Sequence, residues 1–272
     1  MRISLITPSY NQADFITRTI DSVLSQAWNF EIEYIVVDGG STDATTQILE
    51  YFQQQLLDGY ITPCCHNIDF LRSSNKDQWQ SDAINKWLNM ATGDILGYLN
   101  SDDTLEPGAL HLVTDVLGGS DKMRSYGKCH IINIHDQEIR KLITRYKNLI
   151  WRRYSYAKLL RENFISQMTV FWKREAMERV GFFDLDEHLC MDYEYWLRLG
   201  AVYDPVYIPE YIANFRFYHT SKSGARFVQQ FKDELRLAKQ YAKWQYPWSL
   251  LLHHINYYKI ICIYRILSLL KL

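Results

Sequence analysis

The most constraining feature of this sequence is an apolar run that ends abruptly in two adjacent carboxylates. Residues 95–99 have the length and composition of a buried β-strand, and Asn100 and Ser101 then lead into Asp102 and Asp103. Open α/β sheets carry their chemistry just beyond the carboxyl ends of their strands. The sequence shows no basic residue beside the two acids, so they would repel each other unless a cation lay between them or one carboxyl took up a proton.

This segment has two interpretations when it is considered alone. Oxygen ligands at this density suit Mg²⁺ or Mn²⁺, and these cations in turn suit a diphosphate. Alternatively, Asp102 and Asp103, together with the following threonine, cap the helix that begins after Pro107 and have no further role. The rest of the chain has to decide between a cation site and a helix cap.

Composition describes one folded domain with an uneven charge distribution. Of the 272 residues, 47% are apolar and 22% are charged, which suits an α/β protein with a full core. The net charge is −1, yet residues 139–161 contain eight basic residues and residues 235–272 contain six, without an acid in either segment. The remainder has 16 basic against 31 acidic residues, a net charge of −15. This asymmetry predicts contact with something anionic on one side.

Cysteine usage and hydropathy indicate the cytoplasm. The five cysteines are odd in number and form no C-x-x-C pair, which favours a reducing compartment over a disulfide framework or a zinc site. The stretch from Met1 to Pro8 is too short for the apolar region of a signal peptide and fits a first strand. No run approaches the roughly 18 apolar residues of a membrane span. We expect a cytoplasmic protein without an integral membrane segment.

The first 117 residues show the strand–loop–helix alternation of a parallel sheet. Apolar residues between Ile16 and Ala27 recur at helical spacing and predict one buried helix face. Thr42 or Asp43 would cap the second helix. The predicted strands are 3–6, 31–37, 68–73 and 95–99; after the first helix, one helix runs to about residue 55, one from 81 to 91, and one from Pro107 to about 117.

The alternation weakens after residue 117. Residues 125–145 predict a pair of strands, and a basic, aromatic segment follows to Arg161. Two strands broken at Pro205 and Pro209 are predicted between 201 and 218. The remaining predicted elements are a strand at 167–172, helices at 174–180 and 192–199, and helical structure from Ala225 to the end.

A second acidic strand end lies at Asp38. Gly39 and Gly40 follow it and allow close approach of the backbone, so Asp38 is placed to accept a hydrogen bond from a base or a sugar. For this loop alone, an ordinary turn from strand to helix is the simpler interpretation. The loop is not the G-x-G-x-x-G fingerprint, which argues against a Rossmann dehydrogenase.

Taken in order, the motifs of this chain resemble those of the family-2 glycosyltransferases with the GT-A fold, of the bacterial surface-polysaccharide type. Each motif alone is weak, but the whole set, in order and at family spacing over residues 1–225, is specific. The matching segments are Thr7-Pro8-Ser9-Tyr10-Asn11, Val37-Asp38-Gly39-Gly40-Ser41-Thr42-Asp43, Asp77 with Gln80-Ser81-Asp82-Ala83-Ile84-Asn85-Lys86, Ala91-Thr92-Gly93-Asp94, Asn100-Ser101-Asp102-Asp103 with Pro107-Gly108-Ala109-Leu110, and Met191-Asp192-Tyr193-Glu194-Tyr195-Trp196-Leu197-Arg198.

The resemblance implies an α/β fold with a mixed, mainly parallel sheet flanked by helices. Residues 1–225 would form the GT-A domain, in which residues 1–117 bind the nucleotide sugar and residues 118–225 bind the acceptor; residues 226–272 would form a helical C-terminal extension. The implied activity is transfer of a sugar, with inversion, from a nucleotide-diphosphate donor. On family grounds the donor is a UDP-sugar, and the acceptor is a saccharide or a lipid-linked molecule in polysaccharide or glycoconjugate biosynthesis.

The resemblance also implies which residues contact the nucleotide sugar. The nucleoside pocket would include Asp38, which would read the base, and the nucleotide end would be held from a helix that Lys86 braces. The full set is Pro8, Tyr10, Asp38, Asp77, Asp82, Lys86, Ser101, Asp102 and Asp103.

Metal binding and catalysis are implied at three further positions of the same resemblance. Asp102 matches the metal-binding member of the D-x-D element, and His219 matches a late histidine that often meets the metal or the diphosphate; a packed histidine is the alternative. The cofactor would be Mn²⁺ or Mg²⁺, because the leaving nucleotide diphosphate develops negative charge. Asp192 matches the general base, and Glu194, two residues on, competes for that role.

Three departures from the family pattern keep a second function open. Asn100 stands where many relatives carry the first acid of D-x-D, Met191 stands where relatives often have Glu, and Trp79 and Trp87 stand where relatives often have Gly. These departures motivate the alternative of a catalytically impaired nucleotide-sugar-binding subunit or scaffold. A nucleotidyltransferase would need a Gly-rich, basic phosphate loop, which residues 7–14 lack.

The family resemblance does not explain the basic, apolar C-terminal segment. Between Tyr257 and Lys271, apolar residues run almost all the way round a helix, with basic residues at six-residue steps. Such a helix should not stay exposed. It packs on its own domain or on a second copy in a homodimer, or it lies on the anionic inner face of the plasma membrane and places the site over a lipid-linked acceptor. Nucleic acid is not an expected partner, because the chain is slightly acidic and carries no binding motif.

Overall fold

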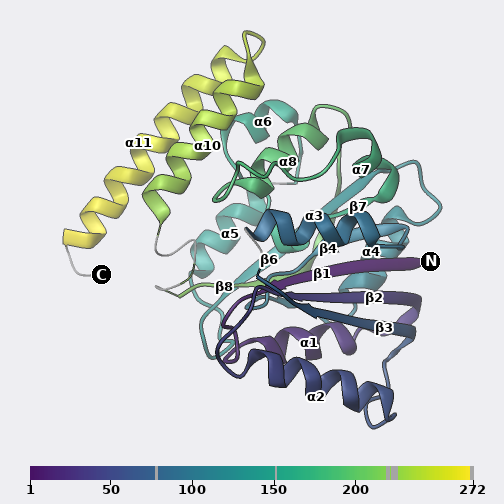
Figure 1. Cartoon of the computed structure of the whole chain (residues 1–272). Coiled ribbons are helices and arrows are strands. Elements are labelled where there is room, and N and C mark those ends of the chain that lie inside the picture. Colours follow the sequence, from purple (N-terminus) through teal and green to yellow (C-terminus); the bar gives the residue numbers. More distant parts are fainter. Residues whose placement is uncertain (77–78, 151, 219–220, 222–225, 270–272) are drawn as a thin grey trace.

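A twisted sheet of eight strands lies at the centre of the protein, whose computed structural model describes residues 1–76, 79–150, 152–218, 221 and 226–269 (Figure 1). Within these residues the strand order is β3-β2-β1-β4-β7-β6-β8-β5. The four strands β1 to β4 pair in parallel, as the strand–helix alternation predicted. The strands are β1 (Arg2–Ser9), β2 (Trp28–Asp38), β3 (Cys65–Ser74), β4 (Ile95–Tyr98), β5 (Thr104–Leu105), β6 (Arg124–Ile132), β7 (Phe171–Lys173) and β8 (Val206–Arg216).

Helices cover both faces of this sheet. Helices α1, α2 and α4 pack on one face, and α3, α6, α7, α8 and α10 contribute to the core on the other (Figure 1). The helices are α1 (Ile16–Leu24), α2 (Thr45–Leu57), α3 (Gln80–Met90), α4 (Ala109–Leu117), α5 (Lys141–Ile150), α6 (Tyr156–Arg161), α7 (Arg174–Val180), α8 (Met191–Gly200), α10 (Phe227–Ala242) and α11 (Pro247–Leu269), with a 3₁₀ turn at Gln167–Thr169.

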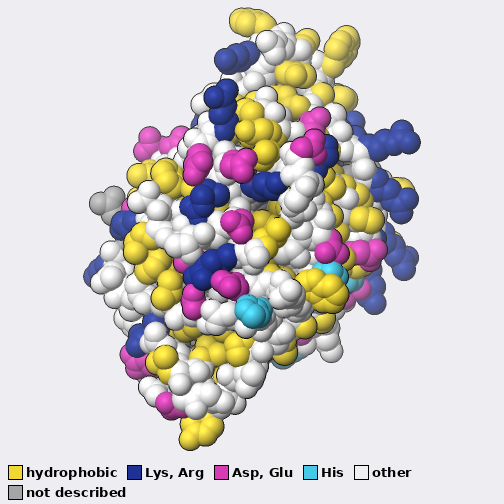
Figure 2. Space-filling model, turned by 90° about the vertical axis from the view of Figure 1, so that its right-hand side faces the viewer, with side chains coloured by type: hydrophobic (Ala, Val, Ile, Leu, Met, Phe, Trp, Pro, Cys, Tyr) yellow, Lys and Arg dark blue, Asp and Glu magenta, His cyan; other side chains and the backbone are white. Residues whose placement is uncertain are grey.

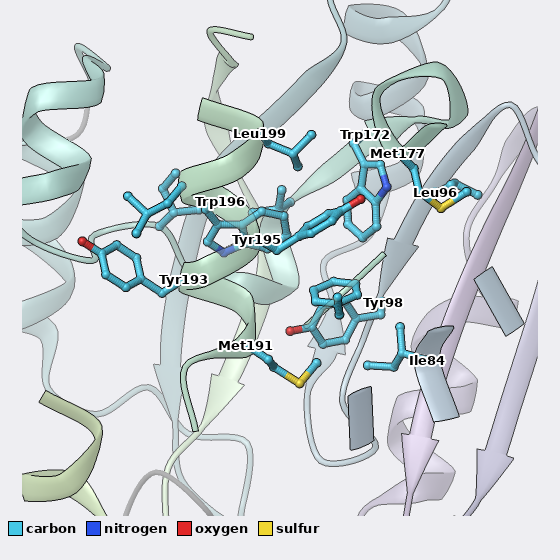
Figure 3. Close-up of a cluster of buried hydrophobic side chains, with 14 of the residues drawn as sticks. Ile84, Leu96, Tyr98, Trp172, Met177, Met191, Tyr193, Tyr195, Trp196 and Leu199 are labelled. Atoms are coloured by element: carbon cyan, nitrogen blue, oxygen red, sulfur yellow. The ribbon is translucent and has the colours of Figure 1, made fainter. Parts of the chain in front are cut away.

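The two cores follow from the pleat of the central strands. Successive residues of a strand point to opposite faces, so Ile6 of β1 enters the core beneath α3 and α8, whereas Leu5 enters the core beneath α1 and α4. Figure 3 shows the first of these cores, in which Tyr98 of β4 lies close to Ile84 of α3 and Met191 of α8. Because both faces are covered, the central strands read as continuous apolar runs.

The register of the parallel strands brings their carboxyl ends to one edge of the sheet. Ser9 pairs with Asp38, and Asp38 pairs in turn with Ser74 on the next strand. On the other side of β1, Ile6 pairs with Tyr98, the last residue of β4. The loops that carry the predicted nucleotide-sugar residues therefore all leave the sheet along the same edge.

The structure corrects several element predictions. Residues 125–145 do not form a pair of strands, because β6 is followed by a turn and by helix α5. One strand, not two, spans residues 206–216. The register between β8 and β6 shifts at Pro209, with Ile208 opposite Gly127 and Tyr211 opposite Lys128. Pro209 lies within this irregularity, so the ladder does not need the N–H that proline lacks. Residues 167–169 form a 3₁₀ turn instead of a strand. Ala27 lies beyond the end of α1 and is exposed.

The predicted C-terminal extension is continuous with the main core. Helices α10 and α11 form an antiparallel pair at one end of the molecule (Figure 1). Leu237 and Ala238 of α10 are fully buried. Helix α11 packs along one side on α10 and α6, where the Nδ1 atom of His253 lies 2.8 Å from the carbonyl oxygen of Leu160. Among the described residues, no helix combines the length and apolarity needed to cross a bilayer.

Candidate active site

The loops that follow β1 and β2 are held together by hydrogen bonds at the sheet edge. The backbone N–H of Asn11 donates to Ser41 Oγ at 2.8 Å, and the Asn11 side-chain oxygen accepts from the N–H of Thr42 at 2.8 Å. Tyr10 projects from this pair of loops with 58% of its surface exposed, whereas Pro8 is buried inside β1. Tyr10 is thus free to contact a ligand, and Pro8 supports the strand beneath it.

Asp38 is fully buried and its carboxylate is already satisfied by the protein. Its Oδ2 atom accepts hydrogen bonds from the N–H groups of Gly40 and Ser41, at 3.1 and 2.9 Å, and from Ser74 Oγ at 2.6 Å. Its Oδ1 atom accepts from Ser41 Oγ. Asp38 therefore shapes the turn after β2 and ties it to the end of β3; its contact with a base stays a prediction.

Asp103 faces into the protein, and Asp102 lies at its surface. Asp103 is 1% exposed; its Oδ1 atom accepts from the backbone N–H of Arg216 at 2.9 Å, and its Oδ2 atom accepts from the Asn100 amide at 3.1 Å. Asp102 is half-buried, and its Oδ2 atom accepts from the hydroxyl of Tyr218 at 2.9 Å. Of the two acids, Asp102 is the one that a ligand can reach, while Asp103 anchors the turn.

Burial raises the pKa of both carboxyls. For Asp103 the pKa lies well above its ordinary value, because burial and then the charge of Asp102 disfavour ionisation. Burial also raises the pKa of Asp102, against the opposing effects of the Tyr218 hydroxyl and the Arg216 charge. No basic residue adjoins the two acids in the sequence, but Arg216 of β8, which is fully buried, donates from Nε to the carbonyl oxygen of Asp102 at 2.7 Å.

Asn100 takes the place of the first acid of the D-x-D element and organises an amide network. Its side-chain oxygen accepts from Gln80 Nε2 at 2.9 Å, and its nitrogen also lies 3.1 Å from Gln167 Oε1. Gln167 donates in turn to the carbonyl oxygen of Tyr98 at 2.6 Å. The amide can donate to Asp103 and accept from Gln80 at the same time, which a carboxylate in this position could not do.

Asp192 and Glu194 have different environments on α8, and the difference decides between them. Glu194 is 2% exposed and its two oxygens accept from Arg198, at 2.7 and 2.8 Å, so it has no access to a substrate. Asp192, in the first turn, is partly exposed. Burial and then the charges of Asp192 and Asp103 raise the pKa of Tyr98, so both acids lie close enough to this buried tyrosine to act on it.

The remaining predicted residues are distributed as follows. Asp82 and Lys86 form an ion pair of 2.7 Å on α3, one helical turn apart. Ser101 is buried, and its carbonyl oxygen accepts from Thr19 Oγ1 at 2.9 Å. Asp77 and His219 lie outside the described residues. Among the described residues, no three His, Cys, Asp or Glu side chains gather to hold a metal ion.

Sequence reasoning missed three residues at this site. Arg216 and Tyr218 stand beside His219 but become partners of Asp102 only when β8 pairs with β5 and β6. Glu234 of α10 lies near Asp192, and burial, followed by the charge of Asp192, raises its pKa to about 8. Adjacency to the late histidine was the available clue for the first two; Glu234 had none.

A cavity of about 570 Å³ lies beside the Asp102–Asp103 turn, and its lining includes Thr104, the residue that follows Asp103. It is lined by α1, β5 and the ends of β6 and β8, including Arg18, Asp136 and Glu138. The ion pairs of Asp136 with Arg18 and Arg216, at 3.1 and 2.5 Å, form part of its wall. We place the active site at the strand ends instead, because the accessible acids and the paired loops converge there.

Comparison with known proteins shows the family of this chain. Residues 4–181 match the profile of the family described as glycosyl transferase family 2. An uncharacterised glycosyltransferase of Nostoc sp. is 32% identical over 145 residues, covering 53% of this chain and 42% of the relative. A glycosyltransferase of PGL/p-HBAD biosynthesis from Mycobacterium bovis is 26% identical over 211 residues, covering 77% of this chain and 73% of the relative. The chain thus spans less than half of the first relative and about three quarters of the second.

Two solved structures share the fold at low sequence identity. The mannosyltransferase PcManGT from Pyrobaculum calidifontis, in complex with GDP-Man and Mn²⁺, superposes with a TM-score of 0.63 at 18% identity over 98% of this chain and 80% of its own. S. aureus TarS 1-349, in complex with UDP-GlcNAc, superposes with a TM-score of 0.58 at 15% identity, over 87% of this chain and 66% of its own. The predicted GT-A architecture is confirmed.

Proposed function

Because this chain belongs to glycosyl transferase family 2, we propose that it transfers a sugar from a nucleotide-diphosphate donor to a hydroxyl group of a saccharide or lipid-linked acceptor. One observation carries the proposal: Asp102 and Asp192 are both partly exposed, and the charges of Asp192 and of Asp103, the neighbour of Asp102, both raise the pKa of the buried Tyr98 at the carboxyl end of β4. This arrangement supplies one carboxylate that can hold a cation near the leaving diphosphate and a second that can act as the base for the attacking hydroxyl.

The transfer is a single displacement with inversion at the anomeric carbon. The acceptor hydroxyl gives its proton to the Asp192 carboxylate, and its oxygen forms the new glycosidic bond. The bond between the anomeric carbon and the diphosphate oxygen breaks, and the electron pair leaves with the nucleotide diphosphate. Asp192 suits the role of base because α8, which carries it, is fixed by the buried Tyr195 and Trp196.

A divalent cation fits the donor chemistry of this site. Mg²⁺ is usually held through one or two carboxylates together with substrate phosphates, and Asp102 offers one such carboxylate. Burial raises the pKa of Asp102 despite the opposing charge of Arg216, and a bound cation would favour the ionised carboxylate. When bound, Mn²⁺ or Mg²⁺ would neutralise charge on the leaving diphosphate. The complex of PcManGT with GDP-Man and Mn²⁺ supports this assignment.

We propose a UDP-sugar as the first donor to test, and a cytoplasmic membrane surface as the location of the acceptor. The TarS complex with UDP-GlcNAc supports the donor, although PcManGT binds GDP-Man. The relative from PGL/p-HBAD biosynthesis supports glycoconjugate chemistry. With a lipid-linked acceptor, the enzyme would have to rest against the membrane that holds it.

Helix α11 has the surface for such a contact with anionic lipid. Its outward side exposes Trp248, Leu251, Ile255 and Tyr258, which recur at helical spacing. Trp244, in the turn before α11, is 97% exposed. Figure 2 shows hydrophobic side chains gathered at the top of the molecule, over the turn between α10 and α11, with basic side chains just below them. An apolar face flanked by cations suits an interfacial helix on an anionic leaflet.

Replacement of Asp192 tests the proposed transfer. Asp192→Asn should lower kcat by at least about 10², the low end for loss of a general base, and leave UDP affinity nearly unchanged. Hydrolysis or transfer from UDP-GlcNAc, UDP-glucose and GDP-mannose with Mn²⁺ provides the assay. Glu194→Gln is the matched control, because it should act on stability instead of kcat. A parent that binds these donors but turns none of them over would instead indicate the catalytically impaired binding subunit.

A further inference from the structure

A small pocket opens beside the proposed base. It has a volume of about 240 Å³ and is formed by the start of α3, the segment that precedes α8, and the residue before α10. Its volume lies below the roughly 300 Å³ at which pockets for drug-sized ligands begin, so it has room for a single ring rather than an oligosaccharide. The lining residues are Trp79, Gln80, Ser81, His188, Leu189, Met191 and Arg226.

One wall of this pocket is an aromatic pair. The indole of Trp79 and the imidazole of His188 are stacked, with ring centroids 4.1 Å apart and an angle of 29° between their planes. Trp79 remains 55% exposed despite this contact. An exposed, rigid indole offers an apolar face to the C–H face of a sugar ring, while the ring hydroxyls stay available for hydrogen bonds.

Polar atoms without a partner complete the wall. Ser81 is 1% exposed, and its hydroxyl has no hydrogen-bond partner among the described residues. The Nδ1 atom of His188 is buried and is in the same state. A buried polar group without a partner is unfavourable, so these atoms favour a ligand that carries hydroxyl groups. The N–H groups of the first turn of α3 add further donors, since Trp79 makes no side-chain cap.

We propose that this pocket binds one pyranose ring, stacked on the indole of Trp79 and hydrogen-bonded to Ser81. Two residues of the pocket lining adjoin groups that we propose act in the transfer. Met191, which lines it, immediately precedes Asp192, and Gln80 donates to Asn100 in the network that holds Asp103. The ring is therefore either the transferred sugar of the donor or the acceptor residue that carries the attacking hydroxyl. This inference rests on the proposed function.

Binding measurements with two classes of probe test the proposal and identify the source of the ring. The donor arm compares UDP-GlcNAc, UDP-glucose and GDP-mannose with UDP and GDP, which lack the ring. The acceptor arm titrates methyl glycosides of the same sugars in the presence of UDP and Mn²⁺. Trp79→Ala should weaken binding about threefold to tenfold in one arm, and UDP affinity should not change.

Three further variants separate recognition from folding. Trp79→Phe keeps an aromatic face and should restore most of the affinity. Ser81→Ala removes a hydroxyl that has no protein partner, so it should weaken ring binding without lowering the melting temperature. Trp28→Ala is the matched control: Trp28 is 56% exposed and stacks on His111 at 3.8 Å with the same 29° angle, but it begins β2 at the opposite edge of the sheet.

The outcomes distinguish this inference from the function on which it rests. Loss in the donor arm assigns the ring to the transferred sugar, and loss in the acceptor arm assigns it to the acceptor. If the parent binds UDP or GDP and neither arm differs between Trp79→Ala and Trp28→Ala by more than about twofold, the pocket is not a ring site. In that case the glycosyltransferase assignment stands. Failure of the parent to bind any nucleotide would instead contradict the proposed function. Binding of the methyl glycosides to the parent and to Trp79→Ala would then show whether the pocket binds a pyranose ring.

Discussion

At the scale of single residues, the four acids of this site differ in what surrounds them. Asp38 and Asp103 are buried and their carboxyl oxygens accept hydrogen bonds from the protein, so they build the loops. Asp102 and Asp192 are partly exposed, and we propose that they act on the cation and the acceptor. Neighbouring carboxyls of the same type thus have different roles because their environments differ.

Asp102→Asn should separate ligand binding from stability. With UDP and Mn²⁺ at a hundredfold excess over Kd, the parent should gain roughly 2.7 kcal/mol of stability, and the variant should lose most of this gain. Without ligand, the variant should be at least as stable as the parent, because it removes a carboxyl whose pKa is raised by burial. Thermal unfolding measures both. The control is Asp121→Asn, whose side chain is 88% exposed. An unchanged ligand-dependent shift in Asp102→Asn would show that the cation assignment is wrong.

Glu234 should make the protein less stable as the pH rises. Burial raises its pKa from 4.5 to about 8, and the charge of Asp192 acts in the same direction. A carboxyl that holds its proton more tightly in the folded state contributes stability that is fully present below about pH 4.5 and is lost as the pH rises through 8. Glu234→Gln keeps an acceptor for Asn163, which donates to Glu234 Oε1 at 3.2 Å, but cannot ionise.

The stability difference between Glu234→Gln and the parent should therefore grow in favour of the variant from pH 5 to pH 8. The increase is at most about 1.4 kcal/mol for each pH unit in that window. Urea unfolding at several pH values measures it, with Glu187→Gln as a control carboxyl that is paired with Arg236 at 2.7 Å. A constant difference across this range would mean that Glu234 is ionised throughout.

At the scale of elements, an ion pair within α8, the helix that carries Asp192, is connected to the C-terminal helix α10 by a hydrogen bond. Arg198 binds Glu194 within α8 and donates to the carbonyl oxygens of Val180 and Phe182 at 2.8 and 2.7 Å. Tyr241 of α10 donates its hydroxyl to the same carboxylate. Helix α10 is thereby fastened to α8, the helix that carries Asp192.

Variants that break the contacts of Glu194 should lower the free energy of unfolding, and the loss should be larger when a charged group is left without its partner. Glu194→Ala leaves the Arg198 guanidinium without its carboxylate in a largely buried position and should destabilise the protein by about 3–5 kcal/mol. Tyr241→Phe removes one hydrogen bond and should cost about 1.5–3 kcal/mol, since the acceptor is charged. Urea unfolding at pH 7 ranks the two variants. Equal effects would contradict the view that the ion pair is the stronger contact.

At the scale of the whole molecule, the outward side of α11 is apolar where a helix in water is usually polar. The parent should co-sediment with anionic vesicles, and Trp248→Ser with Ile255→Ser should reduce its recovery, because both side chains are on that outward side. Salt should weaken binding, since each nearby basic residue contributes about 1 kcal/mol. Leu57→Ser on α2, where Leu57 is 76% exposed, is the control.

Two results would contradict the proposal that α11 binds a membrane. One is equal recovery of the parent and the double variant on anionic vesicles. The other is a parent that is dimeric in solution and a double variant that is monomeric, which would assign the apolar side of α11 to a second copy of the chain. Sedimentation velocity without lipid distinguishes a dimer from a monomer.

The sequence by itself determined the parallel half of the sheet and the order of the motifs along its edge. Strand and helix periodicities are local, so β1 to β4 and the helices between them could be predicted from spacing alone. The same local signal failed for residues 133–150 and for β8. There, short apolar runs fit either a helix or a strand, and a register shift accommodates Pro209.

Only the tertiary structure decided which polar side chains are free to act. Spacing could not show that Asp103 faces Arg216, that Tyr241 donates to Glu194, or that Trp79 stacks on His188. Trp79–His188 and Asp103–Arg216 join residues more than a hundred positions apart, and contacts of this kind leave no periodic trace in either segment. Burial and hydrogen bonding, which decide whether a carboxylate is structural or reactive, arise only when distant segments pack together.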